Sequence, residues 1–227
     1  DDKAVVRREE AALDAYREKL KDAITYHKVT QYFFYQQWAD LKAYANEKGI
    51  KIIGDMPIYI SADSVEVWTM PELFKVDAEK NPLCIAGVPA DSFSDDGQLW
   101  GNPIYDWENH KKTNYAWWVY RIKEGIKLYD LLRIDHFKGF SDYWEIRGDY
   151  ETANDGSWQP GPGRALFDVV RDELGELPII AENLGYIDAK AEQLLTDTAF
   201  PGMKILEFGF YDTEGKSIDA PHNCNKN

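Results

Sequence analysis

Four short apolar runs, each ending on a carboxylate, constrain the fold of this chain more than any other feature. The runs end at Asp55, Asp135, Glu182 and Glu207. Each follows a segment whose apolar residues recur at helical spacing. Parallel strands need helical crossovers, so this alternation predicts about four parallel β/α units. The predicted class is therefore α/β, with these units forming part of a (β/α)8 TIM barrel whose active face collects the strand-end acids.

Capping residues delimit the predicted helices. Gly49 and Gly175 are placed to end two of them, and Asp188 is placed to start another. One helix carries an apolar stripe made of Phe34, Trp38, Leu41 and Ala45. The predicted helical ranges are about 1–20, 31–48, 114–127 and 163–174, with a further helix from 188.

A long turn-rich segment, Cys84 to Asn109, separates the first two predicted strands. A loop of this length without regular structure is usually a functional lid or disordered. Its aromatic content argues against disorder. The sequence therefore predicts a long inserted lid loop over the active face.

Composition excludes several classes of partner. The chain has 40 acidic and 26 basic residues, for a net charge of -14, which repels nucleic acid and anionic membranes. No apolar run approaches the roughly 20 residues of a membrane span. Two cysteines and four histidines form no recognisable metal signature, so we expect no metal and no cofactor. The start lacks the character of a signal peptide, and we expect a cytoplasmic protein.

Two of the acids suit glycosidic bond cleavage. Retaining enzymes place a nucleophile and an acid/base roughly 5–5.5 Å apart, and acids on successive barrel strands can face one cavity. Arg133 shares a strand face with Asp135 and should keep it ionised, as a nucleophile must be. Glu182 has no cation in its segment and could carry a proton at neutral pH.

Several motifs together resemble the amylomaltase family, the 4-α-glucanotransferases of glycoside hydrolase family 77 in the α-amylase clan. They are GDMPIYI, VPADSFSDDGQLWGNPIYDWE, RIDHFKGFSDYW, the GPG near Gly161, IIAENLG and PGMKILEF. The resemblance implies retaining transfer of α-1,4-glucan segments from a donor to a glucose or maltooligosaccharide acceptor. The reaction would pass through a covalent glycosyl-enzyme intermediate and need no cofactor.

The resemblance also implies roles for individual residues. Asp135 would be the nucleophile and Glu182 the acid/base. Arg133 would position the nucleophile, and Asp55 would bind sugar hydroxyls or support the site. The remaining residues expected to contact the glucan are Phe93, Trp100, Asn102 and His136.

One element of the clan's pattern is missing. Its third carboxylate is an Asp usually preceded by His, but the four histidines here are followed by Lys28, Lys111, Phe137 and Asn223. We therefore expect residues 1–227 to be a single partial catalytic barrel domain, truncated at both ends and inactive alone.

Three rival functions remain open. One is an α-1,4-glucan hydrolase of the same clan, and another is a catalytically incomplete glucan-binding fragment. A metal-dependent barrel hydrolase is disfavoured, because His136 is the one histidine beside the strand-end acids.

Overall fold

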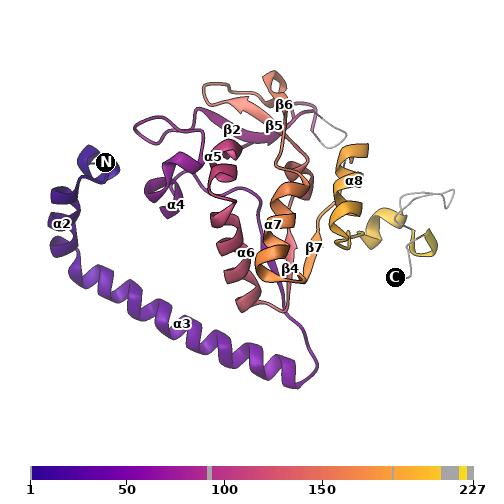
Figure 1. The fold of residues 1–227 in the computed structure, drawn as a ribbon, viewed down its shortest axis with the longest axis horizontal. Coiled ribbons are helices and arrows are strands. Elements are labelled where there is room, and N and C mark those ends of the chain that lie inside the picture. Colours follow the sequence, from indigo (N-terminus) through magenta and orange to yellow (C-terminus); the bar gives the residue numbers. More distant parts are fainter. Residues whose placement is uncertain (1, 91–93, 186, 211–219, 224–227) are drawn as a thin grey trace.

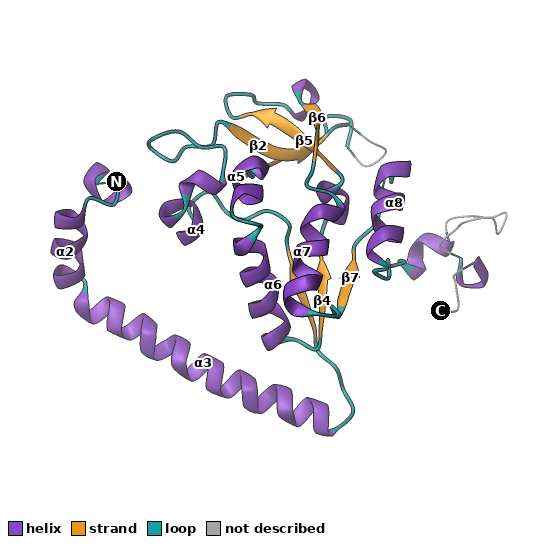
Figure 2. Cartoon of the chain, viewed as in Figure 1, coloured by secondary structure: helices purple, strands orange, loops and turns teal. Residues whose placement is uncertain are grey.

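The strands of this protein form two sheets, one parallel and one antiparallel (Figures 1 and 2). The computed structural model describes residues 2–90, 94–185, 187–210 and 220–223. Helices pack beside the parallel sheet, and the antiparallel sheet lies beyond the carboxyl ends of its strands (Figure 2). This mixed α/β arrangement agrees with the predicted class.

The parallel sheet carries the predicted acids. Its strand order is β1-β4-β7, and Asp55 of β1 lies opposite Arg133 of β4 in the register. Arg133 in turn lies opposite Ile180 of β7. Residues in register on neighbouring strands point to the same face of a sheet, so Asp55 and Arg133 project together. The strand bounds are Ile53–Met56 (β1), Leu131–Ile134 (β4) and Ile179–Ala181 (β7).

The antiparallel sheet was not predicted. It has the order β3-β2-β5-β6, with β2 and β3 inserted between β1 and β4, and β5 and β6 inserted between β4 and β7. The segment from Cys84 to Asn109, predicted as a long loop, is thus largely a strand pair followed by the start of α5. The strand bounds are Cys84–Val88 (β2), Gln98–Pro103 (β3), Asp142–Arg147 (β5) and Ser157–Pro160 (β6).

The helices that follow the inserted strands cover the parallel sheet. Helix α6 contacts β1, β4 and α7, and α7 contacts α8. Their apolar faces meet side chains of β4 and of the turn after it in a core that includes Trp118, Phe137 and Phe167, all almost fully buried. The α-helices are Lys3–Val6 (α1), Glu10–Lys19 (α2), Lys21–Glu47 (α3), Val65–Thr69 (α4), Trp107–Lys112 (α5), Ala116–Leu128 (α6), Arg164–Leu174 (α7) and Ala189–Thr198 (α8). Short 3-10 turns cover Pro71–Leu73 (η1), Phe137–Phe140 (η2), Ala153–Asp155 (η3), Leu206–Phe210 (η4) and Pro221–Asn223 (η5).

The predicted caps are confirmed. Gly49 follows α3 with a φ of +74°, the left-handed conformation that favours glycine. Gly175 ends α7 with a φ of +76°. Asp188 accepts hydrogen bonds from the backbone N–H groups of Lys190 and Ala191 at the start of α8.

The fourth predicted strand, ending at Glu207, is wrong. Residues 201–205 have no regular secondary structure, and Glu207 lies in η4. A strand needs a neighbour that supplies a ladder of hydrogen bonds. Here the backbone N–H of Ala181 in β7 donates to the carbonyl of Pro201 at 2.9 Å, and no further ladder bond joins the two segments in the described part of the chain. Proline and glycine at the start of this segment also disfavour a strand.

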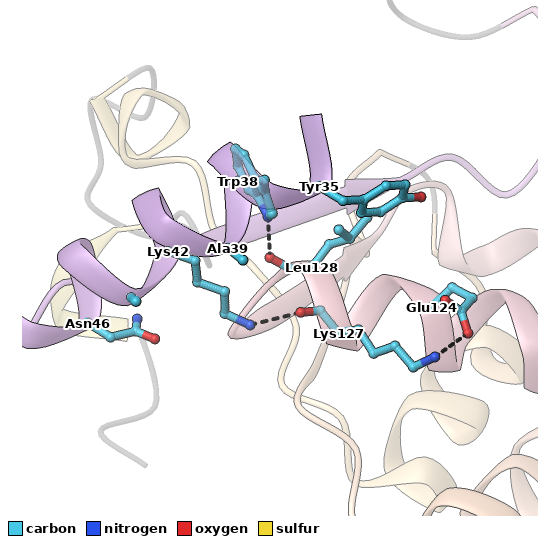
Figure 3. A pocket seen from close by; sticks show the side chains of 9 residues that line it. Tyr35, Trp38, Ala39, Lys42, Asn46, Glu124, Lys127 and Leu128 are labelled. Carbon is cyan, nitrogen blue, oxygen red and sulfur yellow. Dashed lines mark hydrogen bonds and ion pairs between the residues drawn. The ribbon is translucent and has the colours of Figure 1, made fainter. Parts of the chain in front are cut away.

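Helix α3 extends away from the two sheets and contacts the carboxyl-terminal end of α6 (Figure 1). Trp38 Nε1 donates to the carbonyl of Leu128 at 2.8 Å, and Lys42 Nζ donates to the carbonyl of Lys127 at 3.2 Å (Figure 3). A pocket of about 460 Å³ lies between the two helices. The predicted apolar stripe is not buried, since Phe34 is 50% exposed and Leu41 is 53% exposed.

Within the described residues, none of the helices has both the length and the apolar character needed to cross a membrane.

Candidate active site

Arg133 holds two carboxylates at the carboxyl end of the parallel sheet. Its Nη1 lies 2.5 Å from Asp55 Oδ1, and its Nη2 lies 2.7 Å from Asp135 Oδ1. Burial disfavours the charged guanidinium, but the two carboxylates outweigh this, so the pKa of Arg133 is raised. A guanidinium offers several donors in one plane, which suits it to hold both acids at once. The predicted pairing of Arg133 with Asp135 is confirmed.

Glu182 follows β7 and is oriented by backbone groups. Its Oε2 accepts from the backbone N–H of His136 at 2.8 Å, and its Oε1 accepts from that of Leu184 at 2.5 Å. The carboxylate is therefore fixed at both oxygens.

His136 makes the contact between the two acid-bearing segments possible. It has a φ of 51° and a ψ of 50°, a left-handed conformation that is uncommon for any residue other than glycine. Because His136 is the residue after Asp135, this turn points its backbone N–H at Glu182. Burial lowers the pKa of His136 to about 4, against the attraction of the Asp135 charge, so its ring is neutral at pH 7. Backbone strain of this kind is found preferentially at functional sites.

Two adjoining pockets open beside these residues. One has a volume of about 490 Å³ and contains Asp135, and the other has a volume of about 300 Å³ and contains Glu182. Trp100 and His136 line both pockets. Their rings meet edge to face with centroids 4.9 Å apart and form a wall that the two pockets share. The site is therefore a two-part groove with one carboxylate in each part.

The strand β3 supplies the side chains of this groove that sequence reasoning had placed in a loop. Trp100 lies in both pockets, and its Nε1 donates to Gln98 Oε1 at 3.1 Å. Asn102 lies in the Asp135 pocket and donates to the carbonyl of Ile60 at 2.8 Å. Phe93, the remaining predicted contact, lies outside the described residues. Of the other predicted residues, Asp55 reaches the groove through Arg133.

Sequence reasoning missed several residues that line the groove. Tyr59 lines the Asp135 pocket, and Gln98, Lys138 and Trp158 line the Glu182 pocket. Tyr59 and Lys138 lie inside the motifs GDMPIYI and RIDHFKGF, in which sequence reasoning had assigned roles to other residues. The sequence did hold a signal for Tyr59, because it is an aromatic residue close to the predicted strand-end acid Asp55.

Lys138 connects three segments around the Glu182 pocket. It is 7% exposed, and its Nζ lies 2.8 Å from Asp142 Oδ1 and 2.6 Å from Asp188 Oδ2. Burial opposes the charge, but the two carboxylates outweigh it and raise the pKa of Lys138. The ion pairs join η2 to β5 and to the residue that caps α8, which fixes the walls of the pocket.

The groove brings together two oriented carboxylates, an arginine, a neutral histidine and aromatic rings. Among the residues that the structure describes, no group of three or more His, Cys, Asp or Glu side chains is arranged to hold a metal ion.

Comparison with known proteins gives a consistent assignment. The sequence model of the 4-alpha-glucanotransferase family matches residues 2–227. The 4-alpha-glucanotransferase of Streptococcus pneumoniae is 55% identical over 215 residues, which cover 95% of this chain and 42% of the relative. That of Thermus thermophilus is 44% identical over 217 residues, which cover 96% of this chain and 43% of the relative.

A solved structure agrees with these sequences. The amylomaltase from Streptococcus agalactiae in complex with acarbose is 72% identical, with a TM-score of 0.97, and the match covers 100% of this chain and 46% of that one. The chain spans less than half the length of the curated relatives named above. On the match to the family model and on these identities, the chain belongs to the 4-alpha-glucanotransferase family.

Proposed function

We propose that this chain carries the nucleophile and the acid/base of a retaining 4-α-glucanotransferase. Asp135 is the nucleophile and Glu182 the acid/base. The observation that carries this proposal is the chain of contacts from Asp55 through Arg133 to Asp135, and from His136 to Glu182. Structural ion pairs exist in many proteins, but these contacts include Asp135 and Glu182, which each line a pocket.

The reaction takes two steps. First, an Asp135 oxygen bonds to the anomeric carbon of the donor glucan, and Glu182 gives its proton to the departing glycosidic oxygen. Second, a hydroxyl of the acceptor glucan attacks the same carbon and passes its proton to Glu182, while the bond to Asp135 breaks. Arg133 holds Asp135 in line through the 2.7 Å ion pair. Trp100 offers an aromatic surface to the sugar rings, and Asn102 an amide beside them.

We further propose that the three parallel strands are part of a closed (β/α)8 barrel in a longer chain. The β1-β4-β7 order and the helices beside it fit such a barrel. The relatives are more than twice as long as this chain, and the third carboxylate of the clan would come from the remaining strands. We also propose that β2 and β3 belong to the cover that excludes water from the intermediate.

Incubation with maltotriose tests this proposal. A transferase makes glucose together with maltooligosaccharides longer than maltotriose. The test compares residues 1–227 with a protein extended at both ends to the length of the relatives. We expect the extended protein to be active, the short one to be at least about 10²–10³ slower, and Asp135→Asn to abolish the activity.

Three outcomes would contradict the proposal. Glucose and maltose without longer products would identify a hydrolase. Glucan binding without turnover in the extended protein would identify a binding domain. Full activity of Asp135→Asn would remove the nucleophile assignment.

A further inference from the structure

The Glu182 pocket contains a second tryptophan that the proposed roles leave unused. Trp158 of β6 and Trp100 of β3 both line this pocket, with Gln98 and Lys138 as polar neighbours. The Trp158 side chain is 41% exposed, so part of its ring remains open to solvent. Tryptophan faces together with an amide and charged groups are the surface that sugar rings bind, through stacking and hydroxyl hydrogen bonds.

Trp158 is held in a fixed orientation by two neighbours. Trp144 lies opposite it in the β5–β6 register, and their rings meet edge to face with centroids 5.2 Å apart. The Lys138 ammonium lies 4.6 Å from the ring centroid of Trp158, a cation–π distance. Lys138 is itself held by Asp142 and Asp188. A side chain that is fixed before the ligand arrives loses little conformational entropy on binding.

Chemistry decides which sugar this pocket receives. In the proposed reaction, the sugar that becomes covalently bound lies on Asp135. The leaving sugar, and later the acceptor sugar, must lie where Glu182 can reach the exchanging oxygen. The two acids line different pockets that share Trp100 and His136, so we expect the two parts of the groove to receive different sugars.

We propose that Trp158 is the acceptor-side platform of this groove, on which the incoming glucose or maltooligosaccharide stacks. The inference rests on the proposed function. Water needs no stacking surface, so Trp158 raises the chance that a sugar hydroxyl rather than water receives the glycosyl group. Its role is specificity for a sugar acceptor, and it takes no part in proton transfer.

A donor whose leaving group does not use the pocket isolates this step. With α-maltosyl fluoride, the carbon–fluorine bond breaks, fluoride leaves, and the anomeric carbon bonds to an Asp135 oxygen. An oxygen of water or of added glucose then bonds to the anomeric carbon while the bond to Asp135 breaks, and its proton goes to the Glu182 carboxylate and from there to solvent. Fluoride release and transfer products are measured against glucose concentration in the protein extended to the length of its relatives.

We expect Trp158→Ala to raise the glucose concentration for half-maximal transfer about tenfold, while hydrolysis in water alone changes less than about twofold. Trp158→Phe should retain most of the acceptor affinity, because it keeps a ring face. Tyr120→Ala is the matched control, since Tyr120 is a 63% exposed aromatic residue on α6 away from the groove. It should change neither quantity.

The outcomes separate the inference from the function beneath it. If Trp158→Ala folds and transfers to glucose with unchanged half-saturation, the acceptor platform is wrong while the transferase stands. Equal loss of hydrolysis and transfer would show that Trp158 is a structural residue, and would also overturn the inference. Should the alanine variant fail to fold, Trp158→Leu, which is apolar but has no flat ring, carries the same expectation. If the unsubstituted protein releases fluoride but never transfers to glucose, the proposed function itself fails.

Discussion

The backbone N–H of His136, the residue after Asp135, donates to Glu182 Oε2 at 2.8 Å. This contact joins the segment that carries the proposed nucleophile to the side chain of the proposed acid/base. The backbone of Glu182 strengthens the connection, since its N–H donates to the carbonyl of Ile134 and its carbonyl accepts from Phe137. The relative placement of the two acids is thus set by the pairing of β4 with β7, and a change in either strand end would move both.

Replacing Arg133 should impair catalysis more than folding. Arg133→Lys keeps the charge but cannot reach Asp55 and Asp135 with one planar group, so kcat on maltotriose should fall about 10-fold to 100-fold. Arg133→Ala should lower it by about 10²–10³. Both are measured by product analysis in the extended protein.

Arg164→Ala is the control for this series. Arg164 pairs with Asp168 one turn further along α7 and its side chain is 59% exposed. Its loss should leave kcat unchanged. Full activity of Arg133→Lys would show that the double ion pair has no catalytic part.

Glu182→Gln should separate proton transfer from nucleophilic attack. In the unsubstituted protein each Glu182 oxygen accepts from one backbone N–H, of His136 or of Leu184. The glutamine amide has a single acceptor oxygen and can therefore keep only one of these two hydrogen bonds. With maltotriose, kcat should fall about 10²–10⁴ because no proton reaches the leaving oxygen. The first-turnover burst of fluoride from α-maltosyl fluoride needs no such proton and should fall much less, whereas later turnovers still need Glu182 as the base. Similar losses with both donors would contradict the assignment of Glu182 as the acid/base.

Lys138 should contribute strongly to stability. Lys138→Met leaves the buried Asp142 and the partly buried Asp188 without their cation, so the free energy of unfolding should fall by about 3–5 kcal/mol. Changing both partners to asparagine in the same protein should restore part of the loss. Lys127→Met is the control, because Lys127 is 58% exposed and pairs with Glu124, and it should cost less than about 1 kcal/mol. Denaturant unfolding measures each value, and equal losses for the two lysines would overturn the prediction.

His110 should make the fold sensitive to acid. Burial lowers the pKa of His110 from 6.5 to about 4. The Leu73 backbone and the Asp106 charge each raise this pKa, but by less than burial lowers it. Between these two pH values the unfolded chain binds more protons than the folded one. Stability is therefore complete above pH 6.5 and is lost as the pH falls toward 4, by on the order of 1–2 kcal/mol at pH 5.

The test for His110 compares unfolding at two pH values. His110→Phe places a similar ring among Tyr105, Trp107 and Trp117 without a titrating group. In this variant the difference in unfolding free energy between pH 7 and pH 5 should be smaller by on the order of 1–2 kcal/mol. His136, whose pKa is also lowered to about 4, keeps part of the acid sensitivity in this variant. An unchanged pH dependence would show that His110 does not contribute.

The parts of the fold that depend on local sequence were predictable. A short apolar run with an acid at its carboxyl end identified β1, β4 and β7, because helical segments alternate with these runs along the chain. The caps at Gly49 and Asp188 were predictable from the backbone conformation and side-chain hydrogen bonds that each residue type favours. The pairing of Arg133 with Asp135 followed from the two-residue period of a strand.

The parts that depend on distant partners were not predictable. Strands β2 and β5 pair although they come from different connections, and neither shows a strict alternation of apolar and polar residues. The segment ending at Glu207 has strand-like composition but makes a single ladder bond to β7. Trp158 reaches the Glu182 pocket only because β6 pairs with β5, so spacing along the chain gave no signal for it.

The pairing of β2 with β5 has a consequence for local unfolding. The ladder joins the insertion after β1 to the insertion after β4, and strands of this one sheet line both pockets. Opening that ladder would release Trp100 on one side and Trp158 on the other in a single event. The amide hydrogens of β2 and β5 should therefore exchange with solvent as one cooperative unit, and both halves of the groove share one opening equilibrium.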